Sequence, residues 1–96
     1  MATYIVLANF TEQGVRSVKE TVSRADAVKE AATRYGCKMK EIFWVQGQYD
    51  IVTVVEGQDE QSLAAFGLWL GSQGNVKMQT LRAFTRDEMS AIVKKL

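Results

Sequence analysis

The chain has 96 residues, which is enough for one domain with one hydrophobic core and too few for two. Twelve Lys and Arg residues against eleven Asp and Glu residues give a net charge of +1, without the positive excess typical of nucleic-acid-binding proteins. There is no histidine and only one cysteine, Cys37, so the usual ligands for zinc, copper and haem are missing, as are Ser–His and Cys–His nucleophile pairs. We therefore expect no metal and no other cofactor.

The same features predict the compartment. A lone cysteine cannot form an intrachain disulfide, which fits a reducing environment. The N-terminus resembles no secretory signal, and no apolar run approaches the roughly 20 residues that a spanning helix needs. We expect a cytoplasmic protein with no membrane partner.

The first part of the chain predicts a strand followed by helical segments. Residues 3–10 are β-branched and aromatic, and they are apolar at both odd and even positions, which is typical of a strand buried on both faces. Residues 11–22 predict a short helix or helical turn. Ser23 and Asp26 resemble a capping box and predict the start of an amphipathic helix, which should end at Gly36.

The middle of the chain predicts a hairpin. Residues 37–45 form a partly solvated strand, residues 46–49 a short turn with one glycine, and residues 50–56 the clearest strand of the sequence. Asp59 is a suitable N-cap for the next helix. That helix should present Leu63, Phe66, Gly67 and Leu70 on its inner face, with Trp69 off that face.

The last part predicts a strand and a helix. Residues 75–84 form the fourth strand, and Thr85 with Glu88 makes a full capping box that opens a C-terminal amphipathic helix. The complete order is β-α-β-β-α-β plus this helix, which predicts an α+β, ferredoxin-like domain with an antiparallel four-stranded sheet over residues 1–96. This topology implies the strand order 4-1-3-2, and the first and third strands, which are apolar on both faces, fit the two central places.

Two helices can cover only one face of such a sheet. The other face would present residues such as Val6, Ile51 or Val55, depending on which parity points outward. An apolar patch of this kind indicates an interaction surface, so we expect a homodimer or higher homo-oligomer. The alternative is that the last helix covers part of the face.

Several segments together resemble a known family. They are Gly47-Gln48-Tyr49-Asp50 with the Val-rich strand behind it, Leu70-Gly71, Gly74-Asn75-Val76, Thr80-Leu81-Arg82-Ala83-Phe84, and the early segment 11–19. In this order they resemble the GYD-domain family over nearly the whole chain. The resemblance implies a small bacterial protein that assembles as a dimeric α/β barrel from ferredoxin-like units. It implies no particular reaction.

The candidate ligand-binding residues each have a structural alternative. Tyr49 and Asp50 could form a polar pair at a pocket mouth, or Asp50 could bind turn amides while Tyr49 packs over the hairpin. Arg82 could clamp a carboxylate or phosphate, or it could pair with an acidic residue such as Asp50. Trp44 could line a pocket or pack in an interface. The full candidate set is Tyr4, Trp44, Tyr49, Asp50, Thr53 and Arg82.

Three classes of function remain open. The first is a non-catalytic module that binds a small organic ligand or regulates another process, and it is the one we favour. The alternative is a cofactor-free enzyme that uses Asp, Tyr and Arg, with unknown catalytic residues. RNA binding is disfavoured because residues 50–55 lack the aromatic platform of RNA-recognition motifs, and a purely assembling role stays open.

Overall fold

A computed structural model describes all 96 residues and has the predicted order of elements. The N-terminal half contains β1 (Ala2–Phe10), α1 (Glu12–Arg16), a short 3₁₀ helix η1 (Val18–Glu20) and α2 (Thr21–Arg34). The remainder contains β2 (Cys37–Trp44), β3 (Ile51–Gly57), α3 (Glu60–Ser72), β4 (Val76–Ala83) and α4 (Arg86–Val93).

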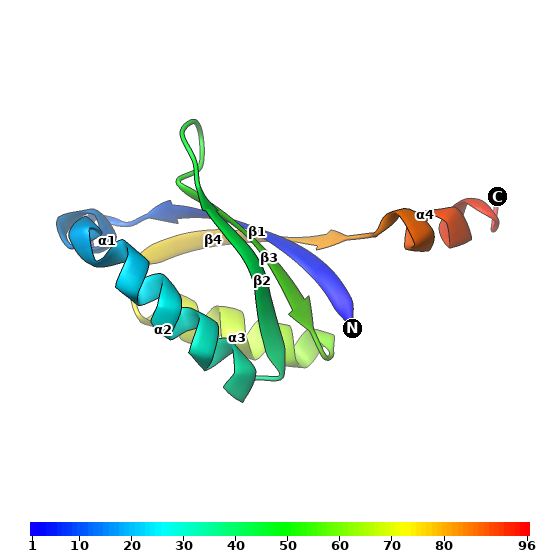
Figure 1. The fold of residues 1–96 in the computed structure, drawn as a ribbon, viewed down its shortest axis with the longest axis horizontal. Coiled ribbons are helices and arrows are strands. Elements are labelled where there is room, and N and C mark those ends of the chain that lie inside the picture. Colours follow the sequence, from blue (N-terminus) through cyan, green and yellow to red (C-terminus); the bar gives the residue numbers. More distant parts are fainter.

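The four strands form one antiparallel sheet in the order β2-β3-β1-β4, which confirms the predicted strand order (Figure 1). β1 is central, so Tyr4 lies opposite Val55 on one side and Arg82 on the other. The edge strand β2 contains an irregularity between Met39 and Glu41, where the register shifts by one residue. This is a β-bulge, which bends and twists the strand.

The start of α2 differs from the prediction. The helix begins at Thr21, and Ser23 is already inside it, where its hydroxyl donates a hydrogen bond of 2.9 Å to the Glu20 carbonyl. No side chain caps this helix, because η1 runs directly into it: the Thr21 N–H donates to the Val18 carbonyl. The C-terminus agrees with the prediction, since Gly36 follows the helix with φ 71°.

The inner face of α3 was predicted correctly except for Trp69. Asp59 caps the helix by accepting a hydrogen bond of 2.7 Å from the Ser62 N–H, and Phe66 is buried. Trp69 was expected off the inner face, and that expectation is wrong. Its ring stacks on Phe66 at 6.3 Å between centroids and packs against Tyr35 at 6.1 Å, because a large indole can reach sideways to the core.

The hydrophobic core lies between one face of the sheet and the helices α2 and α3 (Figure 1). β1 shows the expected alternation, with Tyr4, Val6 and Ala8 buried on the helix side. The buried cluster consists of Tyr4, Val6, Ala32, Cys37, Met39, Val55, Leu63 and Phe66.

The opposite face of the sheet is not covered by any helix (Figure 1). Val6, Ile51 and Val55, the residues suggested for this face, point toward the helices instead. The other parity faces outward. Its apolar members, called the open face below, are Ile5, Leu7, Phe43, Val52, Val54 and Leu81, which the strand register places on neighbouring positions. The parity was wrong because both sets of residues in these strands are apolar.

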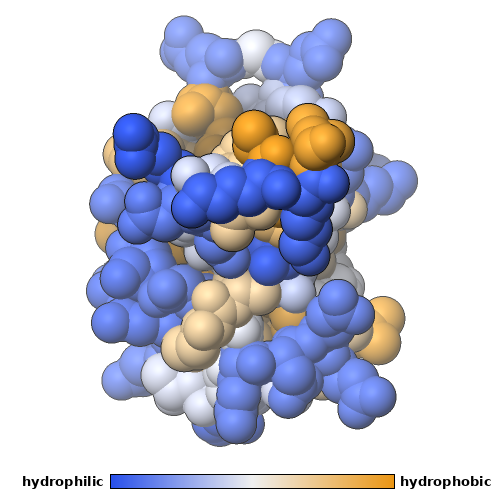
Figure 2. Space-filling model, turned by 90° about the vertical axis from the view of Figure 1, so that its right-hand side faces the viewer, coloured by the Kyte–Doolittle hydropathy of each residue, from blue (hydrophilic) through white to orange (hydrophobic).

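α4 does not cover the open face either. It begins with the predicted capping box of Thr85 and Glu88, and it projects away from the sheet (Figure 1). None of its residues is buried, and Met89 and Val93 are about half exposed. Hydrophobic side chains are visible at the surface on this end of the molecule (Figure 2). No helix of the chain combines the length and apolar composition that crossing a bilayer requires.

Candidate functional site

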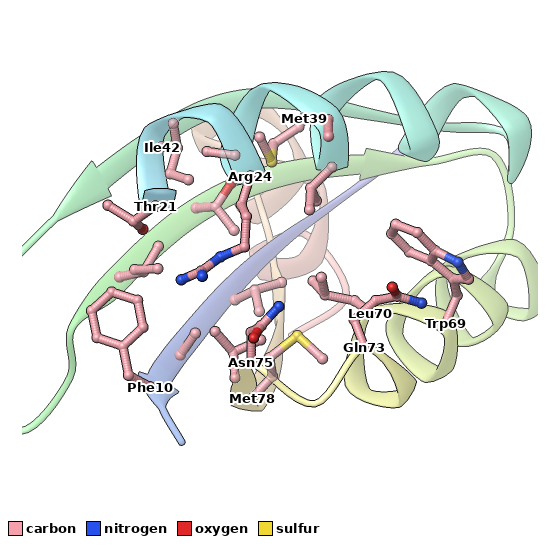
Figure 3. Close-up of a pocket in the computed structure, with 18 residues that line it drawn as sticks. Phe10, Thr21, Arg24, Met39, Ile42, Trp69, Leu70, Gln73, Asn75 and Met78 are labelled. Atoms are coloured by element: carbon pink, nitrogen blue, oxygen red, sulfur yellow. The ribbon is translucent and has the colours of Figure 1, made fainter. Parts of the chain in front are cut away.

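A cavity of about 250 Å³ lies between the sheet and the helices α2 and α3 (Figure 3). Its floor is the helix side of the sheet, with Ala8, Phe10 and Met78 among the contributing side chains. Trp69 and Leu70 of α3 form part of its wall. Thirteen of its eighteen lining residues are hydrophobic, so the cavity suits an apolar molecule.

Arg24 is the only charged residue that lines this cavity, and its side chain reaches from α2 into it (Figure 3). The guanidinium Nη1 donates to the Ser17 carbonyl at 3.0 Å and to the Ser17 hydroxyl at 2.6 Å. Nη2 donates a longer bond of 3.4 Å to the Gly14 carbonyl. All three acceptors are neutral, and no carboxylate lies within ion-pair distance of Arg24.

Of the six predicted ligand-binding residues, only Thr53 lines the cavity. Its hydroxyl donates a hydrogen bond of 2.6 Å to the Glu41 carbonyl at the bulge of β2. Trp44 lies nearby without lining the cavity: its indole N–H donates to the Thr21 hydroxyl at 3.0 Å, which ties the end of β2 to the start of α2.

Tyr49 and Asp50 lie at the hairpin end of the sheet and make structural contacts. The Asp50 carboxylate accepts a hydrogen bond of 2.9 Å from the Phe10 N–H, and its own N–H donates to the Ala8 carbonyl at 2.9 Å. The Tyr49 hydroxyl donates to the Gln79 amide oxygen at 3.0 Å. Asp50 therefore binds a backbone amide at the end of β1 and not one in its own turn, and Tyr49 bonds to a residue of β4.

Tyr4 and Arg82 lie at the other end of the sheet. Arg82 does not pair with Asp50, because β1 places the two residues at opposite ends of the strands. It lies 3.7 Å from the Glu88 carboxylate, and its guanidinium is 4.5 Å from the Phe84 ring centroid and 5.5 Å from that of Tyr4. The Tyr4 hydroxyl is buried without a hydrogen-bond partner. The six candidates therefore lie in three separate regions and form no single site.

The sequence carried a signal for Arg24 that the prediction did not use. Arg24 stands four residues before Val28, so it lies on the apolar face of the predicted helix. A charged residue on that face requires either a partner or a cavity, and the structure provides the cavity. Trp69 also lines the cavity, because its ring reaches the core from α3.

Three groups have shifted pKa values, and none of them lines the cavity. Burial raises the pKa of the Cys37 thiol, and the nearby Asp59 carboxylate adds to the effect. The backbone N–H of Ser62 lowers the pKa of Asp59, and that of Thr85 lowers the pKa of Glu88. A raised pKa keeps the Cys37 thiol protonated, and therefore poorly nucleophilic, near neutral pH.

Comparison with known proteins identifies the family. The model of the GYD domain matches residues 4–93, which include all of α4 and every strand apart from the first two residues of β1. The chain belongs to the GYD-domain family. The family resemblance read from the hairpin and fourth-strand motifs is thereby confirmed.

This GYD-domain protein is similar to two proteins of Thermus thermophilus. One is named glutamine synthetase and cystathionine beta-lyase binding protein; it is 34% identical over 95 residues, which cover 98% of this chain and 100% of that protein. The other comparison is with the crystal structure of TTHA0845. It matches with a TM-score of 0.58 at 26% identity, over 88% of this GYD-domain chain and 95% of that chain.

Proposed function

We propose that this protein is a non-catalytic binding module that works as a homodimer and binds another protein. The observation that carries the proposal is the apolar surface that the chain leaves uncovered, namely the open face of the sheet together with α4. A second copy is the proposed occupant of both. The assembled dimer is the proposed binding unit for a further protein partner.

The size of the open face supports a dimer in which α4 takes part. Four strands of about eight residues make a face of roughly 500 Å². Stable interfaces bury about 800 Å² on each partner, so the sheet face alone falls short of this value. In a two-fold symmetric pair the same patch serves both copies, and each α4 adds area by packing beside the sheet of the other copy.

The structure of α4 supports the same occupant. A helix of eight residues is marginal in water on its own, because the cost of nucleation is recovered only over more turns or through packing. Only Phe84 and Thr85 separate it from β4, and the Arg82–Glu88 ion pair holds its first turn. The helix is therefore held in a fixed direction with Met89 and Val93 uncovered, as a packing element for a second chain would be.

The relative from Thermus thermophilus supports a protein partner. Its name describes a protein that binds two enzymes, and the similarity extends over 98% of this chain. By this similarity we propose glutamine synthetase and cystathionine β-lyase as the first partners to test. Dimerisation does not by itself say which surface of the protein contacts these enzymes. The dimer and the enzyme partners are therefore tested separately.

The dimer is tested by a lysine substitution on the open face. Val52 lies there between Leu7 and Phe43 in the strand register, so Val52→Lys places a charge in the proposed interface. Leu68→Lys is the matched control, because Leu68 is 77% exposed on α3, on the helix side of the sheet. Size-exclusion chromatography with light scattering should give twice the chain mass of 10.7 kDa for the wild type and the control, and the chain mass for Val52→Lys. A monomeric wild type, or a dimeric Val52→Lys, would contradict the dimer.

The partner is tested with purified enzymes. Biolayer interferometry should show saturable binding of the wild-type protein to immobilised glutamine synthetase or cystathionine β-lyase, and weaker binding of Val52→Lys, because the dimer offers two copies of the contact surface. If the protein is dimeric and binds neither enzyme, the proposed partners are wrong while the assembly remains.

A further inference from the structure

We infer that the cavity between the sheet and the helices α2 and α3 binds a small molecule with an apolar body and one carboxylate, which pairs with Arg24. This site goes beyond the proposed function and does not rest on it, because it lies on the opposite side of the sheet from the open face. The inference combines the shape of the cavity, its chemistry and the state of its one charge.

The apolar part of the ligand follows from the lining. Thirteen of eighteen lining residues are hydrophobic, and they come from both helices and all four strands. A cavity of about 150 Å³ with such walls takes up benzene, so about 250 Å³ accommodates roughly ten non-hydrogen atoms. A phenyl ring or a short alkyl chain with a polar end has this size.

The charge of the ligand follows from Arg24. A guanidinium has five N–H donors, and Arg24 uses three of them, on the neutral oxygens of Ser17 and Gly14. These bonds hold the group in one orientation at the cavity wall, while two donors stay available. No Asp or Glu lines the cavity, so its one charge is unneutralised by the chain.

The position of Arg24 near the start of α2 strengthens the preference for an anion. The N-terminal end of a helix carries a partial positive charge, which disfavours a cation and favours an anion there. α2 has fourteen residues, no acidic residue in its first turn, and its first residue, Thr21, also lines the cavity. A carboxylate beside Arg24 is attracted by the guanidinium and by the helix end together.

The recognition predicts a difference between two matched probes. The carboxylate 3-phenylpropanoate has eleven non-hydrogen atoms, and 3-phenylpropanamide has the same shape without the charge. Isothermal titration calorimetry should show at least tenfold tighter binding of the carboxylate to the wild-type protein. Trp69 lines the cavity, so its fluorescence in a Trp44→Phe background should change on the same titration.

Two variants separate the effect of the Arg24 charge on binding from the effect of the cavity volume. Arg24→Met should weaken the carboxylate at least tenfold and leave the amide within twofold. Ala25→Leu fills part of the cavity without touching the charge, so it should weaken both probes at least tenfold. If Arg24→Met does not fold, two measurements still test the inference. They are the affinities of Ala25→Leu for both probes and the ratio of the affinities of the wild type for carboxylate and amide.

The inference is overturned by any of three results. They are equal affinity of the wild type for carboxylate and amide, unchanged carboxylate affinity in folded Arg24→Met, and unchanged affinity of both probes in Ala25→Leu. None of these results bears on the dimer or on the enzyme partners, because Val52→Lys alters the other face of the sheet.

Discussion

Gly14 offers a test in which helix propensity and tertiary packing predict opposite results. It is the third residue of α1 and is buried. In a helix, replacing Gly with Ala normally stabilises a protein by about 0.5–1 kcal/mol. In this structure, however, a Cβ at Gly14 would overlap the carbonyl oxygen of Asn75, a backbone atom that cannot rotate away. We predict that Gly14→Ala destabilises the protein.

The size of the effect follows from what must move. Relieving the overlap separates α1 from the segment before β4, where the Thr11 N–H donates to the Asn75 carbonyl at 3.0 Å and the Thr11 hydroxyl donates to the Gly74 carbonyl at 2.6 Å. Weakening these bonds costs about 0.5–1.5 kcal/mol each. With the steric strain of an added methyl group, the net loss is about 1–3 kcal/mol after the propensity gain.

The assay is thermal unfolding at a fixed protein concentration, with Gly67→Ala as the matched control. A Cβ at Gly67, inside α3, would meet nothing within 4 Å, so this variant should gain up to about 1 kcal/mol. Each kcal/mol corresponds to about 4–8 °C in Tm for a domain of this size. A Tm for Gly14→Ala equal to or above that of the wild type would show that α1 does not lie this close to Asn75, and would refute the prediction.

Three further predictions test other parts of the molecule. Arg82→Ala should lower the Tm by several degrees, because the side chain contacts Phe84 and pairs with Glu88; an unchanged melt and assembly would rule out this structural role. The pKa values of Asp59 and Glu88 are lower in the folded protein than in the unfolded chain. Their ionised carboxylates therefore stabilise the fold above about pH 4–5, and this stabilisation is lost as the pH falls through the pKa values of the folded state. The drop in Tm between about pH 6 and pH 3 should therefore be smaller for Asp59→Asn, and an equal drop would contradict this linkage. Because burial raises the pKa of Cys37, Ellman's reagent at about pH 7.5 should label it far more slowly in the native protein than in guanidinium chloride; equal rates would show an exposed thiol.

The sequence was sufficient for the fold because its strongest patterns are local. The capping residues Asp59 and Thr85 mark two helix starts, and Gly36 marks a helix end. The order of elements implied the strand order, and the two strands that are apolar on both faces agreed with it by fitting the central places. The same double-sided apolarity concealed which parity of β1 faces outward, since Ile5 and Val6 are equally apolar.

The candidate site depended on features that the sequence does not display. The cavity exists because of the spacing between α2 and α3 over the sheet, which is a property of packing. Arg82 was assigned a possible partner, Asp50, that lies at the far end of the sheet, while the real partner Glu88 belongs to the following helix. Thr53 lines the cavity because it shares the helix-facing parity of the buried Val55, a parity that the sequence alone did not fix.

The bulge in β2 has a consequence for the behaviour of the protein at high concentration. An edge strand with a regular ladder can accept a strand from another molecule, and repetition of that event leads to polymerisation. In β2 the register breaks after Met39, so the bulge bends and twists this edge strand. The bulge disfavours the pairing of β2 with a strand of another molecule. Polymerisation through edge-to-edge pairing needs both edge strands, β2 and β4, so it is disfavoured at one of the two edges.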